Sequence, residues 1–305
     1  MNDLPVTERR HPRSKNLDEL PTSSIVRLVV EDAIEGARAV LELVPQVAEL
    51  AEVAARCLGR GGRLLYVGAG TSGRLGVLDA SECPPTFGTD PEVVQGVMAG
   101  GTGALVRSKE GAEDDAGAGA QEMTRREVGE NDLVVGISAS GRTPFVIGAL
   151  EEARRRGATT SGIAFVEEPA LAAVSDHLVS IALGPEVVTG STRLKAGTAT
   201  KIVLNALSTA CMVRRGHVYS NLMVNLQAGC EKLEGRALRI TAELAGITED
   251  AAASILAGAE GDLRVAIVMH RLSVSKEEAD RRLAAAGGNL RQALGDATGS
   301  TGDVP

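Results

Sequence analysis

One short motif occurs twice in the first half of the 305-residue chain, and this repeat most constrains the fold. The segments Val67-Gly-Ala-Gly-Thr-Ser-Gly-Arg74 and Val135-Gly-Ile-Ser-Ala-Ser-Gly-Arg142 align at a constant offset of 68 residues and share Val, Gly, Ser, Gly and Arg. Each follows a short apolar run and precedes a stretch with helical spacing, so each predicts a loop that joins a strand to a helix. Two such loops on one parallel sheet face the same crevice at the carboxyl edge of the strands.

Further strand candidates alternate with helical stretches around this repeat. Their alternation predicts an α/β fold, in which helices cover both faces of a parallel sheet as a three-layer α/β/α arrangement. Between the second and third strand, the spacing predicts one helix over 104–126. The strands are predicted from short apolar runs at 63–67, 93–98, 132–137, 160–165 and 178–182.

The sequence on either side of the predicted sheet has a different character. Residues 1–20 are polar, and we expect an arm that is mobile or wraps a neighbouring molecule. Beyond Lys195 the spacing is helical almost to the end, which predicts a C-terminal helical bundle. We therefore expect three parts: an N-terminal arm with helices (1–53), a sheet domain (54–217) and a C-terminal helical region (218–305).

The composition excludes several classes of function. The net charge is −8, from 32 Lys and Arg against 40 Asp and Glu, so we expect no binding of nucleic acid or of an anionic membrane. Trp is absent, and 2 Tyr and 3 Phe are too few to stack bases. No stretch reaches the roughly 18 uninterrupted apolar residues of a membrane span. The histidines are scattered and the four cysteines form no CxxC pair, so we expect no metal site and a reduced, cytoplasmic compartment.

The first loop also matches the glycine pattern of a dinucleotide-binding motif, with Gly68, Gly70 and Gly73 in place. That motif needs an acidic residue at the end of the next strand, where it would hold the ribose hydroxyls. The next strand candidate ends in Val97-Met-Ala-Gly-Gly101, without an acid. We therefore favour a sugar-phosphate site over a nucleotide site.

Hydroxyl side chains in both loops suit a phosphate ester. Each loop opens a helix, whose free backbone N–H groups attract an anion. The alternative is that these hydroxyls only cap the helices. Arg74 and Arg142 could bind the anion or form ion pairs on a helix face. The candidate phosphate ligands are Thr71, Ser72, Ser138, Ser140, Arg142 and Thr143.

The two loops and several later segments resemble a known family. The segment 138–143 is similar to the loop of the sugar isomerase (SIS) domain, and 68–86 resembles the N-acetylmuramic acid 6-phosphate etherases of bacterial cell-wall recycling. Segments 110–114, 186–198 and 221–225 are also similar to that family, so the resemblance covers nearly the whole chain. The chain departs from the family at His11-Pro12, where the family usually has Asn-Pro.

The resemblance implies an SIS-type sheet, a UBA-like C-terminal region and a homodimer with its site near the interface. It also implies a substrate, an amino sugar 6-phosphate that carries a D-lactyl ether at C3. Ring opening acidifies the proton at C2, a base removes this proton, an acid protonates the departing lactate oxygen, and water adds at C3. Such an elimination and hydration uses two carboxyl groups in opposite protonation states and no cofactor.

Glu82 and Glu113 are the candidates for these two roles. We expect Glu82 to lie at the end of the helix that follows the first loop, because Pro84-Pro85 should end that helix just after it. The negative end of a helix disfavours an ionised carboxylate, which suits an acid, although a surface glutamate is the alternative. The residues alone leave Glu110, Glu113 and Asp114 equal as candidates for the base, and the family resemblance implies Glu113.

A later loop contains two further candidate residues, and the same loops would also suit two other functions. Ser191 and Lys195 are candidate substrate ligands, although a helix start followed by a lysine gives the same pattern. A non-catalytic sugar-phosphate sensor similar to glucokinase regulatory protein is the main alternative, and an aldose–ketose isomerase is a third. The presence of both Glu82 and Glu113 favours the lyase, because a sensor needs no such pair.

Overall fold

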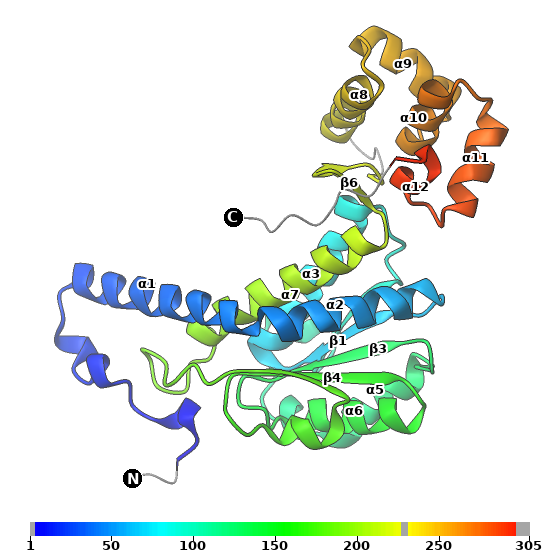
Figure 1. Ribbon diagram of the computed structural model, residues 1–305. Coiled ribbons are helices and arrows are strands. Elements are labelled where there is room, and N and C mark those ends of the chain that lie inside the picture. Colours follow the sequence, from blue (N-terminus) through cyan, green and yellow to red (C-terminus); the bar gives the residue numbers. More distant parts are fainter. Residues whose placement is uncertain (1–3, 227–230, 297–305) are drawn as a thin grey trace. The chain divides into compact units, whose positions relative to one another are not determined.

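The computed structural model describes residues 4–226 and 231–296, and its contacts divide the chain into two compact units (Figure 1). The first unit consists of Met1–Glu82 and Asp90–Cys211 and contains the sheet. The second consists of Cys83–Thr89 and Met212–Pro305 and is mostly helical. The functional boundaries expected near residues 53 and 217 stay predictions.

The sheet is parallel throughout, with the strand order β2-β1-β3-β4-β5. Because β1 lies between β2 and β3, the chain leaves β1 toward one neighbour and later returns to the other. The carboxyl ends of β1 and β3 are level, with Gly68 opposite Ile137, so the two repeat loops share this edge. The predicted parallel sheet is therefore confirmed. Its strands are β1 (Leu64–Gly68), β2 (Val94–Met98), β3 (Leu133–Ile137), β4 (Thr159–Ala164) and β5 (His177–Ser180).

Helices cover both faces of this sheet. Helix α2 (Val44–Gly59) packs against β1, β3 and β5 on one face, and α6 (Pro144–Arg155) packs against β1, β3 and β4 on the other (Figure 1). Helix α5 (Ala116–Arg125) lies along α6. Because both faces are covered, the two central strands β1 and β3 have no charged residue, and every residue of both is buried.

An ion pair joins β1 and β3 at the opposite, amino edge. The Arg63 guanidinium lies 2.7 Å from the Asp132 carboxylate, and the Arg63 backbone N–H donates to the same group at 2.8 Å. Burial by itself would raise the pKa of Asp132, but hydrogen bonds from Arg63 and Gly129 and the Arg63 charge lower it below its ordinary value. This contact helps to keep the two strands in register.

The helix predicted over 104–126 is wrong. The chain forms three pieces there: α4 (Gly103–Val106), a 3₁₀ helix at Ala112–Asp114, and α5. The breaks have local causes, because Gly111 adopts a left-handed φ of 71° and the Asp115 carboxylate caps α5 by accepting from the Ala118 N–H at 2.8 Å.

The arm packs against its own chain over the described residues 4–20, and its mobility or its wrapping of a neighbouring molecule stays a prediction. Thr7 and His11 are buried. The Thr7 carbonyl accepts from the Gly190 N–H at 3.1 Å, and the Ser14 hydroxyl donates to the Val187 carbonyl at 2.7 Å. The arm contains three 3₁₀ helices and leads into α1, with bounds Val6–Glu8, Pro12–Ser14, Leu17–Glu19 and α1 Thr22–Ala39.

Two further helices flank the sheet and continue into the second unit: α3 (Gly70–Phe87) and α7 (Lys195–Arg214). Two shorter 3₁₀ helices complete the first unit, at Val40–Leu43 and Ala170–Val174. The predicted end of α3 before Pro84 is wrong, because the helix continues through both prolines to Phe87.

The second unit consists of a short hairpin and five helices over its described residues, and it confirms the expected C-terminal helical bundle. Its core is apolar, with Ala266, Ile267 and Val268 fully buried on α10. In this unit the Phe87 carbonyl accepts from the Asn225 side-chain amide at 2.6 Å, so the end of α3 is satisfied by a residue far along the chain. The elements are β6 (Val218–Tyr219), β7 (Leu222–Met223), α8 (Glu231–Ala245), α9 (Glu249–Gly258), α10 (Leu263–Leu272), α11 (Lys276–Ala285) and α12 (Leu290–Leu294).

Candidate functional site

The first repeat loop is a tight turn from β1 into α3. Gly70 begins the helix with a left-handed φ of 52°. A Cβ at Gly73 would lie 2.5 Å from the Gly68 carbonyl oxygen, so no side chain fits at that position. Thr71 and Ser72 are half-buried in the first turn, and among the described residues neither hydroxyl has a hydrogen-bond partner in the protein. The turn thus presents two uncommitted hydroxyls beside the free N–H groups of a helix start.

The second loop joins β3 to α6 and uses its hydroxyls differently. The Ser138 side chain is only 3% exposed, and its Oγ lies 2.7 Å from Oγ1 of Thr143 and 3.3 Å from Oγ of Ser140. Thr143 precedes the first residue of α6, yet its side chain makes no capping hydrogen bond. The capping alternative therefore does not apply to Thr143, and the three hydroxyls form one cluster.

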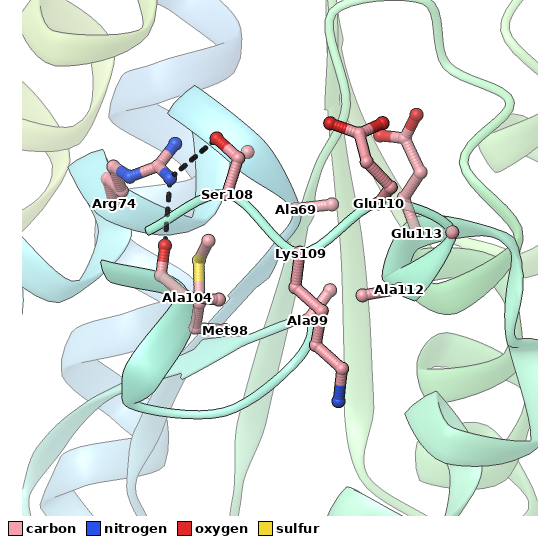
Figure 2. Close-up of a pocket in the computed structure, with 12 residues that line it drawn as sticks. Ala69, Arg74, Met98, Ala99, Ala104, Ser108, Lys109, Glu110, Ala112 and Glu113 are labelled. Carbon is pink, nitrogen blue, oxygen red and sulfur yellow. Dashed lines mark hydrogen bonds between the residues drawn. The ribbon is translucent and has the colours of Figure 1, made fainter. Parts of the chain in front are cut away.

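A small cavity lies beside the first loop and holds the candidate base. We call this cavity of about 160 Å³ the Glu113 cavity. In Figure 2 the carboxylates of Glu110 and Glu113 point in the same direction, and the Lys109 ammonium points away from both. Asp114 does not line the cavity. Its lining consists of Ala69, Gly70, Arg74, Met98, Ala99, Ala104, Ser108, Lys109, Glu110, Gly111, Ala112 and Glu113.

Arg74 fastens the segment that carries these glutamates. Its Nε donates to the Leu105 carbonyl at 2.9 Å, and its Nη2 donates to the Ala104 carbonyl at 2.8 Å and to the Ser108 hydroxyl at 3.5 Å (Figure 2). These carbonyls end the four-residue helix α4, where no further turn satisfies them. Arg74 therefore neither forms the expected helix-face ion pair nor leaves its guanidinium free for a ligand.

The candidate acid, Glu82, lies apart from that cavity. It is exposed on α3, twelve residues after Gly70. At a rise of 1.5 Å per residue, Glu82 lies about 18 Å farther along the helix than Gly70, which lines the Glu113 cavity. We expected Glu82 at the end of this helix, but α3 continues to Phe87, five residues beyond it. Its neighbour Cys83 is buried, as expected for a small structural residue.

Lys195 is buried in a network of charges rather than exposed to a cavity. Its side chain is 6% exposed, and its Nζ lies 2.9 Å from an oxygen of Asp32 and donates to the Pro185 carbonyl at 2.9 Å. Nε2 of His11 lies 3.3 Å from the same Asp32 oxygen. The Glu186 carboxylate accepts from the N–H groups of Lys195 and Ala196, both at 2.9 Å. This network joins the arm, α1 and the start of α7.

The other predicted ligands lie around the same edge of the sheet. Ser140 and Arg142 line a cavity of about 320 Å³ together with Arg9 of the arm. Thr71 lines a third cavity, described below, against α7. Ser191 lies in the loop before α7, half-buried. The structure thus joins Ser138, Ser140 and Thr143 in one cluster, and it places Thr71 and Arg142 at two different cavities.

Comparison with known proteins agrees with this geometry. A profile of the glucokinase regulatory protein N-terminal SIS domain matches residues 43–154, and an SIS domain profile matches residues 115–210. The N-acetylmuramic acid 6-phosphate etherase of Nostoc sp. is 48% identical over 95% of this chain and 94% of its own length. The protein of that name in Cutibacterium acnes is 46% identical over 96% of this chain and 97% of its own length. The chain belongs to the N-acetylmuramic acid 6-phosphate etherase family.

Among solved structures, a phosphoheptose isomerase from Francisella tularensis aligns with a TM-score of 0.46 and 19% identity over 66% of this chain and 98% of that chain.

For this etherase-family chain, sequence reasoning missed the clamping role of Arg74 and the burial of Lys195. Asp32, the partner of Lys195, is followed by Gly36 one turn later on α1. A Cβ at Gly36 would lie 2.5 Å from Cγ of Lys195, so the glycine makes room for the lysine. An aspartate and a glycine one turn apart were the available signal, but nothing local indicates that a residue 163 positions later fills the space.

Among residues 4–226 and 231–296 of this family member, no group of three or more His, Cys, Asp or Glu side chains could hold a metal ion. Within the same residues, no helix combines the length and the apolar character needed to cross a membrane.

Proposed function

We propose that this protein is a lyase that cleaves the D-lactyl ether of N-acetylmuramic acid 6-phosphate. The products are N-acetylglucosamine 6-phosphate and D-lactate. The relatives, nearly half identical over almost the full chain, carry the name of this activity. The observation that carries the proposal is the cluster of Ser138, Ser140 and Thr143, whose hydroxyls bond to each other rather than cap α6. The O–H groups of such a cluster can turn toward phosphate oxygens. No backbone N–H group of α6 then loses a capping hydrogen bond, because the Thr143 side chain makes none.

The phosphate is bound at the shared edge of the two loops. Ser138, Ser140 and Thr143 donate from the second loop, while Thr71 and Ser72 donate from the first. Both helix starts direct N–H groups and the positive end of their dipole at this edge. Arg142 is exposed there, has no protein partner among the described residues, and adds one positive charge. Ser191 completes the site from the loop before α7.

Glu113 removes the C2 proton of the ring-opened sugar. It lines the cavity beside the first loop, and Arg74 holds the segment that precedes it. Glu110 lines the same cavity and is the alternative base. Lys195 was a candidate substrate ligand, but its ion pair with Asp32 favours a positioning role in which it fixes the start of α7. The chemistry requires no redox cofactor or metal, because a proton and lactate leave and water adds.

Glu82 protonates the departing lactate oxygen, and we propose that it does so in the site of a second copy. An acid and a base on neighbouring carbons must each come within about 3 Å of their atoms. Glu82 does not line the Glu113 cavity and lies about 12 Å along α3 beyond Arg74, the cavity residue nearest to it on that helix, so the two glutamates of one chain are poorly placed to serve one substrate. A homodimer in which each chain contributes one glutamate to each site removes this difficulty.

The surface of α1 supports a dimer. Val26, Val30 and Ile34 recur every four residues and are 56, 51 and 44% exposed, so they form an apolar stripe along the helix. Such a stripe on a chain with a net charge of −8 favours a partner surface. We further propose that the protein acts in the cytoplasm, where its buried cysteines Cys57, Cys83 and Cys211 stay reduced.

Isotope exchange tests the division of labour between the glutamates. A Glu82→Gln variant should release almost no lactate but still exchange the C2 hydrogen for deuterium in heavy water, since enolate formation does not need the acid. A Glu113→Gln variant should do neither. Each deficit should be about 10²- to 10⁴-fold, the usual range for a general acid or base. Proton NMR of recovered substrate decides, and normal lactate release from either variant would exclude that residue from the chemistry. Glu110→Gln tests the alternative base, and this variant should release lactate and exchange the C2 hydrogen as the wild type does.

Subunit mixing tests the shared site. Refolding equal amounts of the Glu82→Gln and Glu113→Gln chains together gives mixed dimers, each with one site that contains both glutamates. The mixture should regain about a quarter of the wild-type lactate release, although each variant alone is inactive. An inactive mixture that still forms dimers by light scattering would place both glutamates in one chain. A sensor similar to glucokinase regulatory protein would release no lactate in any of these assays.

A further inference from the structure

A cavity between the first turns of α3 and α7, which we call the α7 cavity, enters the mechanism above only through the Thr71 hydroxyl. It has a volume of about 370 Å³. Its lining contains two cations and no carboxylate, in a chain with an excess of acidic residues. A Cβ at Gly197 would lie 3.4 Å from the Thr71 methyl group, so the helices approach closely beside the cavity. The lining residues are Thr71, Leu75, Arg193, Gly197, Thr198, Lys201 and Ile202.

Arg193 brings an uncommitted charge to this cavity. Its side chain is exposed, and it has no hydrogen-bond or ion-pair partner among the described residues. The first N–H groups of α7 do not compete for the same ligand, since Glu186 already accepts from those of Lys195 and Ala196. An anion in the α7 cavity would therefore be bound by side chains rather than by the helix end.

Lys201 is held beside the cavity by a relay of polar groups. Its Nζ donates to the side-chain oxygen of Asn205, and the Asn205 amide donates to Asp79 at 2.6 Å. Asp79 is only 5% exposed and also accepts from the Ser208 hydroxyl at 3.2 Å. The buried carboxylate sets the direction of the amide, and the amide oxygen in turn positions the ammonium. A lysine that is fixed in this way loses less entropy when it binds an anion.

The α7 cavity adjoins the Glu113 cavity. Thr71 and Leu75 line the former, while Gly70 and Arg74 line the latter. Successive residues of an α-helix differ by about 100° around its axis, so the two cavities lie on neighbouring sides of the first turn of α3. Both adjoin the loop where the phosphate is proposed to bind.

We propose that Arg193 and Lys201 bind a carboxylate, namely the lactyl carboxylate of the substrate. This inference rests on the proposed function, because that substrate carries two anionic groups and the hydroxyl loops account only for the phosphate. A guanidinium matches the two oxygens of a carboxylate, and the fixed ammonium adds a second charge. The sugar product lacks this carboxylate. The α7 cavity thus distinguishes the substrate from the product, which otherwise share the phosphate and the sugar.

Binding measurements on an inactive protein test this assignment. In a Glu113→Gln background, calorimetry would compare the affinities for the lactyl sugar phosphate and for N-acetylglucosamine 6-phosphate. Adding Arg193→Gln should weaken binding of the first ligand about 10- to 100-fold and leave the second within about twofold. Arg193→Lys should recover part of the loss, and Lys201→Gln should act in the same direction. Arg239→Gln, at an exposed arginine of α8, is the matched control.

Several outcomes would overturn the proposal. Equal weakening of both ligands would assign Arg193 to the phosphate or to the fold. If Arg193→Gln weakened the binding of free D-lactate but not that of the lactyl sugar phosphate, the α7 cavity would be a site for a separate carboxylic acid. If wild-type protein releases no lactate but the carboxylate preference of Arg193 persists, the proposed function fails and the carboxylate site stands. If lactate is released and Arg193→Gln has no effect on binding, only the carboxylate site fails.

Discussion

The two repeat loops have the same sequence pattern but use its residues in different ways. In the first loop the Arg74 guanidinium is committed to backbone carbonyls, while the hydroxyls of Thr71 and Ser72 have no protein partner. In the second loop the arrangement is reversed. Ser138 is buried and bonded to other hydroxyls, and Arg142 is exposed without an acceptor among the described residues.

The neighbours of each loop explain this difference. After the first loop, the chain passes through β2 into α4, whose terminal carbonyls lie within reach of Arg74. The second loop instead faces the arm and residues 166–168, where no carbonyl accepts from Arg142. The repeated pattern thus specifies a strand–turn–helix backbone, and the packing around it decides whether an arginine positions the protein or remains available to a ligand.

The largest expected difference between the loops is in their serines. Ser138→Ala leaves a gap in the buried cluster and removes a ligand for the phosphate, so KM should rise about 10- to 100-fold with a smaller change in kcat. Ser72→Ala removes a single half-buried hydroxyl, and its KM should rise only about tenfold. Steady-state lactate assays would measure both effects. An unchanged KM in both variants and in the double variant would remove the phosphate assignment.

The matched arginines should differ in the parameter that changes. Arg74→Met frees the segment before Glu113, so kcat should fall about tenfold and KM should change little. The same variant should also be cleaved faster by trypsin at Arg107 or Lys109. Arg142→Met should raise KM a few-fold and leave kcat and the cleavage rate unchanged. If Arg74→Met raised KM alone, its guanidinium would be a ligand group and not a clamp.

The threonines should give the smallest difference. Thr143→Val removes one partner of Ser138, whose hydroxyl keeps Ser140, so KM should rise about threefold to tenfold. Thr71→Val keeps the shape of the side chain and loses one half-buried donor, so its KM should change by about threefold or less. Thermal unfolding supplies the control, because neither variant should shift Tm by more than about 2 °C. A larger loss in Thr71→Val would make the first loop the principal phosphate site.

The strands and the shared edge could be predicted from the sequence because their signals are local. Continuous apolar runs such as Leu133–Ile137 indicate strands buried on both faces, and parallel strands bring their following loops to one edge. The path of 104–126 was mispredicted because helical spacing continues across Gly111 and Asp115. Asp115 before an alanine-rich stretch is a capping signal, and it was available in the sequence.

The features that were missed depend on residues far apart in the chain. The continuation of α3 through Pro84 accompanies a capping bond to Phe87 from Asn225, 138 positions later. The burial of Lys195 depends on Asp32 and His11, and the clamp by Arg74 depends on where α4 ends. Local propensity contains no information about these partners. The site residues therefore stay predictions, and their positions relative to one another could not be read from the sequence.

The buried pair of Asp32 and Lys195 has a consequence for synthesis on the ribosome. Lys195 emerges 163 residues after Asp32, which at roughly 5–20 residues per second is a delay of about 8–30 s. During that interval α1 can form as a helix, but it lacks the ammonium that neutralises its inward-facing carboxylate. The N-terminal helix therefore lacks this partner until the last sheet strand has emerged, and a pause in translation before residue 195 would prolong the time for which the Asp32 carboxylate lacks the Lys195 ammonium.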